Sequence, residues 1–468
     1  MLGTKSIFRF KKFHDAYLAS TDAGTWMFLT PGEFDAFMQL QPDRIDPDLY
    51  RRLFERSFIV DPSRLDREVD TLHCKFGGFF CGPTLFIIGI TEVCNLQCYY
   101  CHANSQPYQA ATNRFSDETI AKIVEFILGC MGGNATIEFQ GGEPLLDFST
   151  VRRFIEKIKS NPRCDERFFR YSLSTNLTLL TDEMCRYFAD NKVRVVGSID
   201  GPKEVHDLQR RYIDGRGTHD DVLRAIERAK RAGVSLSLIA VLTKNSIENV
   251  QAIVDELVDH GVSQIALNWP QRNGRALERR FWDKIGLGAD DYSRIWKQTV
   301  EYIAELTNGS GSSITERYLQ LILHKILTPY SPNYMDWRSP CGAVIGQVSF
   351  DHAGNIYPCD EARGDNRLII GNIHTDTFYD VMGREISQKV IGASLLENEI
   401  CDYCVYKPFC GICPVLSFKA GGDFQSFREF RYRCRIFTFM FDFVFQRILD
   451  GDTSVFSIGV NGDDGVAQ

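Results

Sequence analysis

Apolar positions in the middle of the chain follow two alternating patterns. Between residues 84 and 269, short runs rich in β-branched residues alternate with longer stretches in which apolar residues recur at helical spacing. The short runs are TLFIIGI, ATIEF, RYSLS, VRVVGSI, SLSLIAVL and SQIALNW, and the helical stretches begin near Ser116, Asp147, Thr181, Thr218 and Asn249. Strands that alternate with helices pair in parallel, so the pattern predicts an α/β fold with a partial (β/α)6 barrel. Functional loops should gather at the C-terminal ends of its strands.

Residues 1–80 predict a separate, winged-helix-like module. Two strand candidates, FRFKKF and TWMFLT, flank AYLAST and a turn signal at Asp22-Ala23-Gly24. Thr30-Pro31-Gly32-Glu33 has the pattern of a capping box with proline at the first helical position, and Asp46-Pro47 starts a second helix in the same way. This module carries no catalytic motif.

The remaining boundaries follow from composition. We expect the barrel over residues 81–285, a helical bridge over 286–335, a cysteine-rich domain over 336–450 and a disordered tail over 451–468. Phenylalanines at 437, 439, 441, 443 and 445 alternate as in a strand, but the surrounding stretch has a helical pattern. We expect a buried helix there. The apolar stretch from Ile436 to Phe445 is too short to cross a bilayer.

Composition narrows the function classes. Hydrophobic residues make up 44% of the 468 residues, and the net charge is −8. Such a chain is globular and offers no basic surface to nucleic acid. The N-terminus lacks the apolar core of a signal peptide, so we expect a cytoplasmic protein with no membrane or nucleic-acid partner. Fifteen cysteines in such a chain favour metal or redox use over disulfides.

Three of these cysteines follow the first predicted strand directly: Cys94, Cys98 and Cys101. Three thiolates in one loop can hold three corners of a [4Fe-4S] cluster and leave one iron open. A zinc site with His102 as the fourth ligand is the alternative. The spacing at the end of a barrel strand resembles the radical S-adenosylmethionine (SAM) superfamily, in which SAM is cleaved reductively and the resulting radical abstracts hydrogen from the substrate.

The resemblance also implies SAM contacts. Gln140-Gly141-Gly142-Glu143 matches the motif that holds the methionyl amino group, where glycines allow close approach and the carboxylate pairs with the ammonium group. Other residues implied at the site are Ser174 and Asn176 for the ribose and carboxylate, Arg210 for the SAM carboxylate, and Tyr100 as a shield over the cluster. Each has an ordinary alternative as a loop, surface or packing residue.

A second group of seven cysteines follows the order Cys341, Cys359, Cys401, Cys404, Cys410, Cys413 and Cys434. This order resembles the SPASM domain of peptide and sulfatase maturases, which binds two auxiliary [4Fe-4S] clusters. The resemblance assigns Cys341, Cys359 and Cys413 to the first cluster and the other four to the second. A zinc ribbon is the alternative. In VSFDHAGNIYPC, Gly354 predicts a tight hairpin that returns Cys359 beside Cys341.

Two features depart from the SPASM pattern. Only Gly411 and Ile412 separate Cys410 from Cys413, one residue fewer than usual, and no extra cysteine precedes Cys341. The first auxiliary cluster therefore has an open iron or a ligand such as Asp336. The remaining cysteines lack metal spacing and are expected in the core or on the surface: Cys74, Cys81, Cys130, Cys164 and Cys185.

The strand and helix order of the N-terminal module resembles PqqD-like elements, which bind leader peptides by strand addition. A simple cap over the barrel is the alternative. The segments EFQGGEPLLDF, KILTPYSPNY and DEARGDNRLIIGNIHTDTF resemble maturases of His-Xaa-Ser systems and their cyclophane-forming relatives. This implies hydrogen abstraction from a side-chain carbon of a ribosomally made precursor peptide and closure of a C–C, ether or thioether cross-link.

In such a reaction an auxiliary cluster accepts an electron, and a flavodoxin- or ferredoxin-type protein is the expected reductant. Candidate bases near strand ends are Asp200, His206 and Asp207, which are equally good turn residues. Formylglycine formation on a sulfatase is the alternative reaction. A non-catalytic iron-sulfur electron carrier or peptide-binding protein is an alternative of another class.

Overall fold

A computed structural model of the chain describes residues 3–40, 45–61, 65–108, 114–131, 133–165, 168–261, 264–310, 314–332, 334–395, 399–456 and 458. The side chain of Asp336 and the tail from residue 459 onward lie outside the described residues. Within them, no helix is long and apolar enough to cross a membrane.

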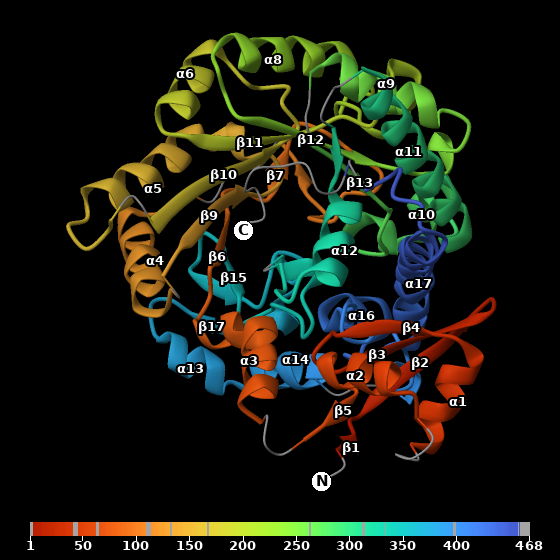
Figure 1. Cartoon of the computed structure of the whole chain (residues 1–468). Helices are drawn as coiled ribbons and strands as arrows, with labels where there is room; N and C mark the ends of the chain where they lie inside the picture. The colour runs from red at the N-terminus through yellow and green to blue at the C-terminus, as the bar shows by residue number, and fades with distance from the viewer. Residues whose placement is uncertain are drawn as a thin grey trace.

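All six predicted barrel strands form, and they pair in parallel (Figure 1). In spatial order they are β6 (Leu85–Gly89), β9 (Ala135–Gln140), β10 (Phe169–Thr175), β11 (Val193–Ser198), β12 (Leu236–Val241) and β13 (Gln264–Asn268). A short strand, β14 (Thr315–Glu316), extends the sheet beyond β13. Five helices cover the outside of the curved sheet: α4 (Asp117–Cys130), α5 (Phe148–Ser160), α6 (Asp182–Asp190), α8 (His219–Arg231) and α9 (Val250–Asp259).

The sheet continues on the other side of β6 into the cysteine-rich region. β15 (Gln347–Phe350) pairs in parallel with β6, and β16 (Asn355–Tyr357) and β17 (Gly371–Asn372) follow in antiparallel order. Gly354, with φ of +80°, makes the predicted hairpin between β15 and β16. The hairpin that was expected to belong to a separate domain is therefore part of the barrel sheet.

Helices complete the C-terminal half. The bridge consists of α11 (Ala289–Ser310) and α12 (Arg317–Leu327). Shorter helices follow: α13 (Phe378–Gly383), α14 (Glu385–Leu395), α15 (Glu399–Asp402) and α16 (Pro414–Gly421). The phenylalanine series lies in the buried helix α17 (Phe427–Asp450), as predicted. The expected disordered tail begins too early, because Val455 and Ile458 are buried in the core.

The N-terminal module contains a three-stranded antiparallel sheet: β2 (Phe8–Phe13), β3 (Ala16–Thr21) and β4 (Trp26–Leu29). AYLAST, to which the sequence assigned no strand, is the central strand. Both predicted helices form, α1 (Pro31–Gln39) with the capping box of Thr30 and Glu33 and α2 (Pro47–Glu55) capped by Asp46. A small β1–β5 pair (Thr4–Lys5 and Ile59–Val60) and α3 (Leu65–Phe76) complete it.

The two faces of this small sheet bury different neighbours. Ala19 and Met27 belong to a core shared with α1 and α2, whereas Leu18 belongs to the main core of the molecule. Polar contacts accompany the second face, because the Ser20 hydroxyl donates to the Val405 carbonyl at 2.6 Å and Arg9 Nε donates to the Asp402 carbonyl at 2.8 Å. The module is therefore docked on the cysteine loop of residues 401–410.

Truncation of a side chain at this junction should destabilise the protein. Leu18→Ala removes a side chain that is 0% exposed, so we expect a loss of about 2–5 kcal/mol in the free energy of unfolding. Denaturant titration measures it. Leu65→Ala, at a position that is 62% exposed, is the control and should change stability by less than about 0.5 kcal/mol. Equal effects of the two changes would contradict the docking of the module.

Candidate active site

A cavity of about 1090 Å³ occupies the inside of the barrel. Cys94, Cys98 and Cys101 border it, and so do Cys341, Cys359 and Cys413 from the other end of the chain. Single-ligand sites are usually about 300–1,000 Å³. The cavity can therefore take more than one small molecule, and it brings together the two cysteine groups that the sequence separates by more than two hundred residues.

The first cysteine group is compact. Cys94 lies in β7 (Val93–Cys94), just after β6. Burial raises the pKa of the Cys98 thiol to about 11; the neighbouring Cys101 raises it further, while Arg210 and Arg275 oppose the shift. Burial also raises the pKa of Cys94, with Cys98 and Cys101 among the added causes. These thiols are close enough to repel one another as thiolates, so a cationic group among them would favour their ionised form.

Gly141 and Gly142 hold this loop from behind. The Gly142 amide donates to the Thr91 carbonyl at 2.7 Å. A Cβ on Gly142 would collide with the Val93 backbone, and Gly141 has φ of +149° and would collide with Thr91. Both glycines also line the cavity. Glycine is required here because the backbone packs closely against the segment that carries Cys94. The close approach of a ligand that we expected from the sequence would be a second reason for glycine.

Glu143 does not lie where the expected pairing with an ammonium group requires. Its carboxylate is 0% exposed and is absent from the cavity lining. It accepts hydrogen bonds from the Thr175 hydroxyl at 2.6 Å, the Asn176 amide at 2.8 Å and the Leu145 amide at 3.0 Å. Burial raises the pKa of Glu143 to about 7. This side chain anchors the end of β10 behind the cavity wall.

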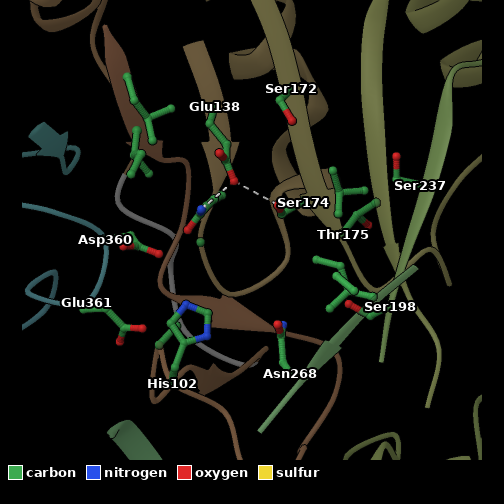
Figure 2. Close-up of a pocket in the computed structure, with 18 of the residues that line it drawn as sticks. His102, Glu138, Ser172, Ser174, Thr175, Ser198, Ser237, Asn268, Asp360 and Glu361 are labelled. Carbon is green, nitrogen blue, oxygen red and sulfur yellow. Dashed lines mark hydrogen bonds between the residues drawn. The ribbon is translucent and has the colours of Figure 1, made fainter. Parts of the chain in front are cut away.

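The other expected SAM contacts do border the cavity. Gln140 Nε2 and the Ser174 hydroxyl both donate to Glu138, at 2.6 and 3.1 Å (Figure 2). Asn176 Nδ2 donates to Asn95 at 2.9 Å and lies 3.7 Å from the Cys94 sulfur. Asn176 thus links the end of β10 to the first cysteine loop.

Tyr100 and Arg210 meet over a buried carboxylate. The Tyr100 hydroxyl and Arg210 Nε, the latter at 3.0 Å, both donate to Oδ2 of Asp200. Arg210 also stacks on the Tyr100 ring, with 5.1 Å between the guanidinium carbon and the ring centroid. Asp200 Oδ1 accepts from the Val241 amide at 3.0 Å. Asp200 therefore orients two cavity-lining side chains beside Cys98.

The expectation of a base among Asp200, His206 and Asp207 is not supported, because none of the three lines the cavity. The Asp200 carboxylate already accepts hydrogen bonds from Tyr100, Arg210 and the Val241 amide. The His206 ring is fully buried between the Asp200 amide and the Thr218 hydroxyl, and burial lowers its pKa to about 4. Asp207 caps α8 by accepting from the Thr218 and His219 amides. All three make structural contacts between β11 and α8, Asp200 just after β11 and the other two in the short helix α7 (Lys203–Gln209).

Other titratable side chains border the cavity instead. Figure 2 shows His102, Asp360 and Glu361 grouped on one side of it, across from Glu138. Within the described residues, the Asp360 carboxylate accepts no hydrogen bond, whereas Glu361 accepts one from Asn273. Burial lowers the pKa of His102, and Asp360 opposes that shift. His102 was considered only as a zinc ligand, and Asp360 was not predicted; its position directly after Cys359 is the sequence signal that could have found it.

Arg275 is a further residue that the sequence did not indicate. It is buried, and its guanidinium donates to the carbonyl of Cys98 at 2.6 Å and to that of Ser105 at 2.8 Å. Its own amide donates to the Cys101 carbonyl at 2.9 Å. The loop after β13 thus closes over the first cysteine loop.

The cysteine quartet, defined here as Cys401, Cys404, Cys410 and Cys434, borders a separate cavity of about 80 Å³. Burial raises the pKa of Cys410, and the other three thiols of the quartet raise it further. Burial raises the pKa of the Cys359 thiol, and Cys413 and Cys341 are among the groups that raise it further. Cys413 borders this small cavity as well as the large one, and the expected division of the seven cysteines into two groups stays a prediction.

The spacing of these thiols bears on what they can hold. Among the described residues, no three His, Cys, Asp or Glu side chains converge on a point so as to hold a single metal ion. A zinc ion needs its donors at about 2.0–2.3 Å, whereas an iron-sulfur cluster is held by thiolates at its outer corners. The thiols of the site lie around the two cavities.

Comparison with known proteins agrees with this geometry. Residues 88–257 match the radical SAM superfamily. The chain carries a radical SAM domain and is an enzyme of that class, which implies SAM and a [4Fe-4S] cluster as cofactors.

Relatives of this chain include sulfatase-maturating enzymes and a radical SAM cyclopropyl synthase. A cysteine-type anaerobic sulfatase-maturating enzyme of Clostridium perfringens is 26% identical over 375 residues, covering 78% of this chain and 97% of that protein. The radical SAM cyclopropyl synthase TigE of Paramaledivibacter caminithermalis is 22% identical over 434 residues, covering 88% and 85%.

Two solved structures share the fold. The anSMEcpe protein with bound AdoMet and Cp18Cys peptide has a TM-score of 0.67 and 24% identity, covering 80% of this chain and 99% of that one. Streptococcus suis SuiB bound to the precursor peptide SuiA has a TM-score of 0.56 and 15% identity, covering 92% and 99%. The mixed α/β architecture with its parallel sheet is therefore the fold of these two structures.

Addition of a single methyl group at Gly142 should disrupt the first cysteine loop. Gly142→Ala forces the Val93–Cys94 backbone to move, at a cost of about 1–3 kcal/mol, and iron bound at this group should fall. Iron analysis after anaerobic purification measures it. Gly129→Ala in α4, where a Cβ meets open space, should leave the iron content unchanged. Full iron content in Gly142→Ala would contradict this role.

Neutralisation of Asp200 should cost stability. Asp200→Asn leaves the buried Arg210 charge without its partner, so we expect a loss of about 3–5 kcal/mol in the free energy of unfolding. Asp214→Asn removes an exposed partner of Arg216 and should cost at most about 1 kcal/mol. Both are measured by denaturation. An Asp200→Asn variant of normal stability that cleaves SAM but forms no product would restore Asp200 as a base.

Proposed function

We propose that this chain is a radical SAM/SPASM maturase that installs an intramolecular cross-link in a ribosomally synthesised precursor peptide. The observation that carries the proposal is the single cavity bordered by two cysteine groups and by Asp360. Its volume suits a peptide segment lying beside SAM. In this proposal residues 336–450 form the SPASM domain, and residues 1–80 form a PqqD-like leader-binding module.

In the proposed enzyme, each of the three cysteine groups holds one iron-sulfur cluster. Cys94, Cys98 and Cys101 hold the SAM-binding cluster, Cys341, Cys359 and Cys413 the first auxiliary cluster, and the cysteine quartet the second. When bound, these groups supply a carbon-centred radical that removes a hydrogen atom from the substrate and an acceptor for the electron released on cross-linking.

The protein's residues supply position and proton transfer. Ser174, Asn176 and Arg210 line the cavity around the first cysteine group and would orient SAM. Closing a bond between two side chains releases one proton along with the electron. Asp190 and Asp360 are the cavity-lining carboxylates with no hydrogen bond among the described residues, and Asp360 directly follows Cys359 of the site, so Asp360 is the proposed acceptor of that proton.

The N-terminal module supports a peptide substrate. β2 is an edge strand of the small sheet, and its residue Phe10 and the preceding Ile7 are exposed and apolar. An edge strand offers unpaired backbone groups to an extended peptide. The structure of SuiB, which carries a precursor peptide, aligns with 92% of this chain, whereas the sulfatase-maturase structure aligns with 80%.

Formylglycine formation is the second candidate, and the match to 97% of a sulfatase-maturating enzyme favours it. The two reactions differ in product. A cross-linked peptide has lost two hydrogen atoms and carries no aldehyde, whereas formylglycine carries an aldehyde that reacts with hydrazides.

The decisive experiment is anaerobic co-expression with each short peptide that the neighbouring reading frames encode, followed by mass spectrometry and hydrazide labelling. We expect the peptide to lose two hydrogens and to remain unlabelled by the hydrazide. With the Cys98→Ala variant, the peptide should remain unmodified. Asp360→Asn should still form 5′-deoxyadenosine but should lower cross-linking about 10²-fold or more. Hydrazide labelling of a serine or cysteine position would favour the sulfatase-type reaction, and no SAM cleavage would contradict both.

A further inference from the structure

Two buried lysines flank the cysteine quartet. Lys325 of α12 is 2% exposed, and its ammonium group donates to the carbonyls of Trp337 and Phe409, the latter at 2.8 Å. Lys75 of α3 is 5% exposed and lies over the Phe409 ring, 5.1 Å from its centroid. Phe409 directly precedes Cys410, so both cations surround the backbone that carries one thiol of the quartet.

Among the described residues, neither Lys75 nor Lys325 forms an ion pair with a carboxylate. The lysines that do form ion pairs there are all others. The carbonyls that accept from Lys325 are dipoles without net charge. Burial of an ammonium group is expensive unless an opposite charge compensates it, and two nearby ammonium groups add repulsion.

The compensating charge is available at the quartet. Burial lowers the pKa of Lys325 to about 7 and Lys75 lowers it further, whereas the Cys410 thiolate opposes the shift and favours the ammonium form. A [4Fe-4S] cluster with four thiolate ligands is a net anion, and its reduction adds a further negative charge. A buried cation nearby stabilises the reduced state more than the oxidised one, because the low dielectric screens little.

We propose that Lys325, with Lys75 behind it, is the buried countercharge of the second auxiliary cluster and raises its reduction potential. The inference rests on the proposed function, which assigns that cluster to the quartet. Lys325 is a positioning residue in this proposal, since it touches neither substrate nor thiol. Its effect is to make the second auxiliary cluster a better electron acceptor.

The test uses the full chain with Cys94, Cys98 and Cys101 each changed to Ala, so that only auxiliary clusters contribute. Lys325→Gln keeps a donor for the two carbonyls but removes the charge. In a redox titration followed by electron paramagnetic resonance, it should lower the ratio of reduced to oxidised second cluster at a fixed potential about tenfold, or about 59 mV. Lys325→Arg should restore the ratio. Lys203→Gln, which removes an exposed lysine paired with Asp220, should leave it unchanged.

Each outcome decides. An unchanged potential in Lys325→Gln with both clusters present overturns the inference alone. Failure of Lys325→Gln, but not Lys325→Arg, to assemble the second cluster supports it. If neither Lys325 variant assembles the second cluster, the Lys75→Gln variant decides. A lowered reduction potential of its second cluster supports the countercharge, and an unchanged potential overturns it. Iron for only one cluster in the parent, about four per chain, overturns the second cluster and the inference together.

Discussion

The parallel pairing of β6 with both β9 and β15 determines the geometry of the whole site. One register brings Gly89 opposite Gln140, and the other brings Ile88 opposite Phe350. The loop after β6 carries Cys94, the loop after β9 carries the glycines that support it, and the hairpin after β15 returns Cys359. Backbone hydrogen bonds along one strand therefore assemble cysteines from distant parts of the chain around one cavity.

Buried charge is the second organising feature. Asp200 accepts hydrogen bonds from Tyr100 and Arg210, and Arg275 donates hydrogen bonds to carbonyls of the first cysteine loop. Such groups are costly to bury unless they are paired, so each fixes the geometry of its neighbours. Lys75 and Lys325 stand apart because their countercharge is not a carboxylate.

Much of this could be predicted from local sequence. The six barrel strands, the capped helices of Thr30 and Asp46, and the hairpin at Gly354 depend on short-range patterns, and all formed as predicted. The division of the later cysteines into two groups came from the family resemblance, since the two groups interleave along the chain. AYLAST was not predicted as a strand because contacts that bury it, such as the hydrogen bond of Ser20 to Val405, come from far along the chain.

The polar residues at strand ends were harder, because facing a cavity and filling a turn require the same residue types. Asp200 and Asp207 turned inward to distant partners, while Asp360 was overlooked beside a cysteine. Glu143 shows the same limit, since its three hydrogen-bond donors come partly from β10. The position of such carboxylates depends on tertiary contacts that no local pattern contains.

The central claim is that three cysteine groups hold three clusters around a cavity built for radical chemistry. Mössbauer spectroscopy with iron analysis of the anaerobically purified chain tests it most directly. The account predicts about twelve irons per chain, all in [4Fe-4S] clusters, with the spectrum of the SAM-binding cluster changing when SAM is added. Zinc in place of iron, or iron for one cluster only, would contradict it.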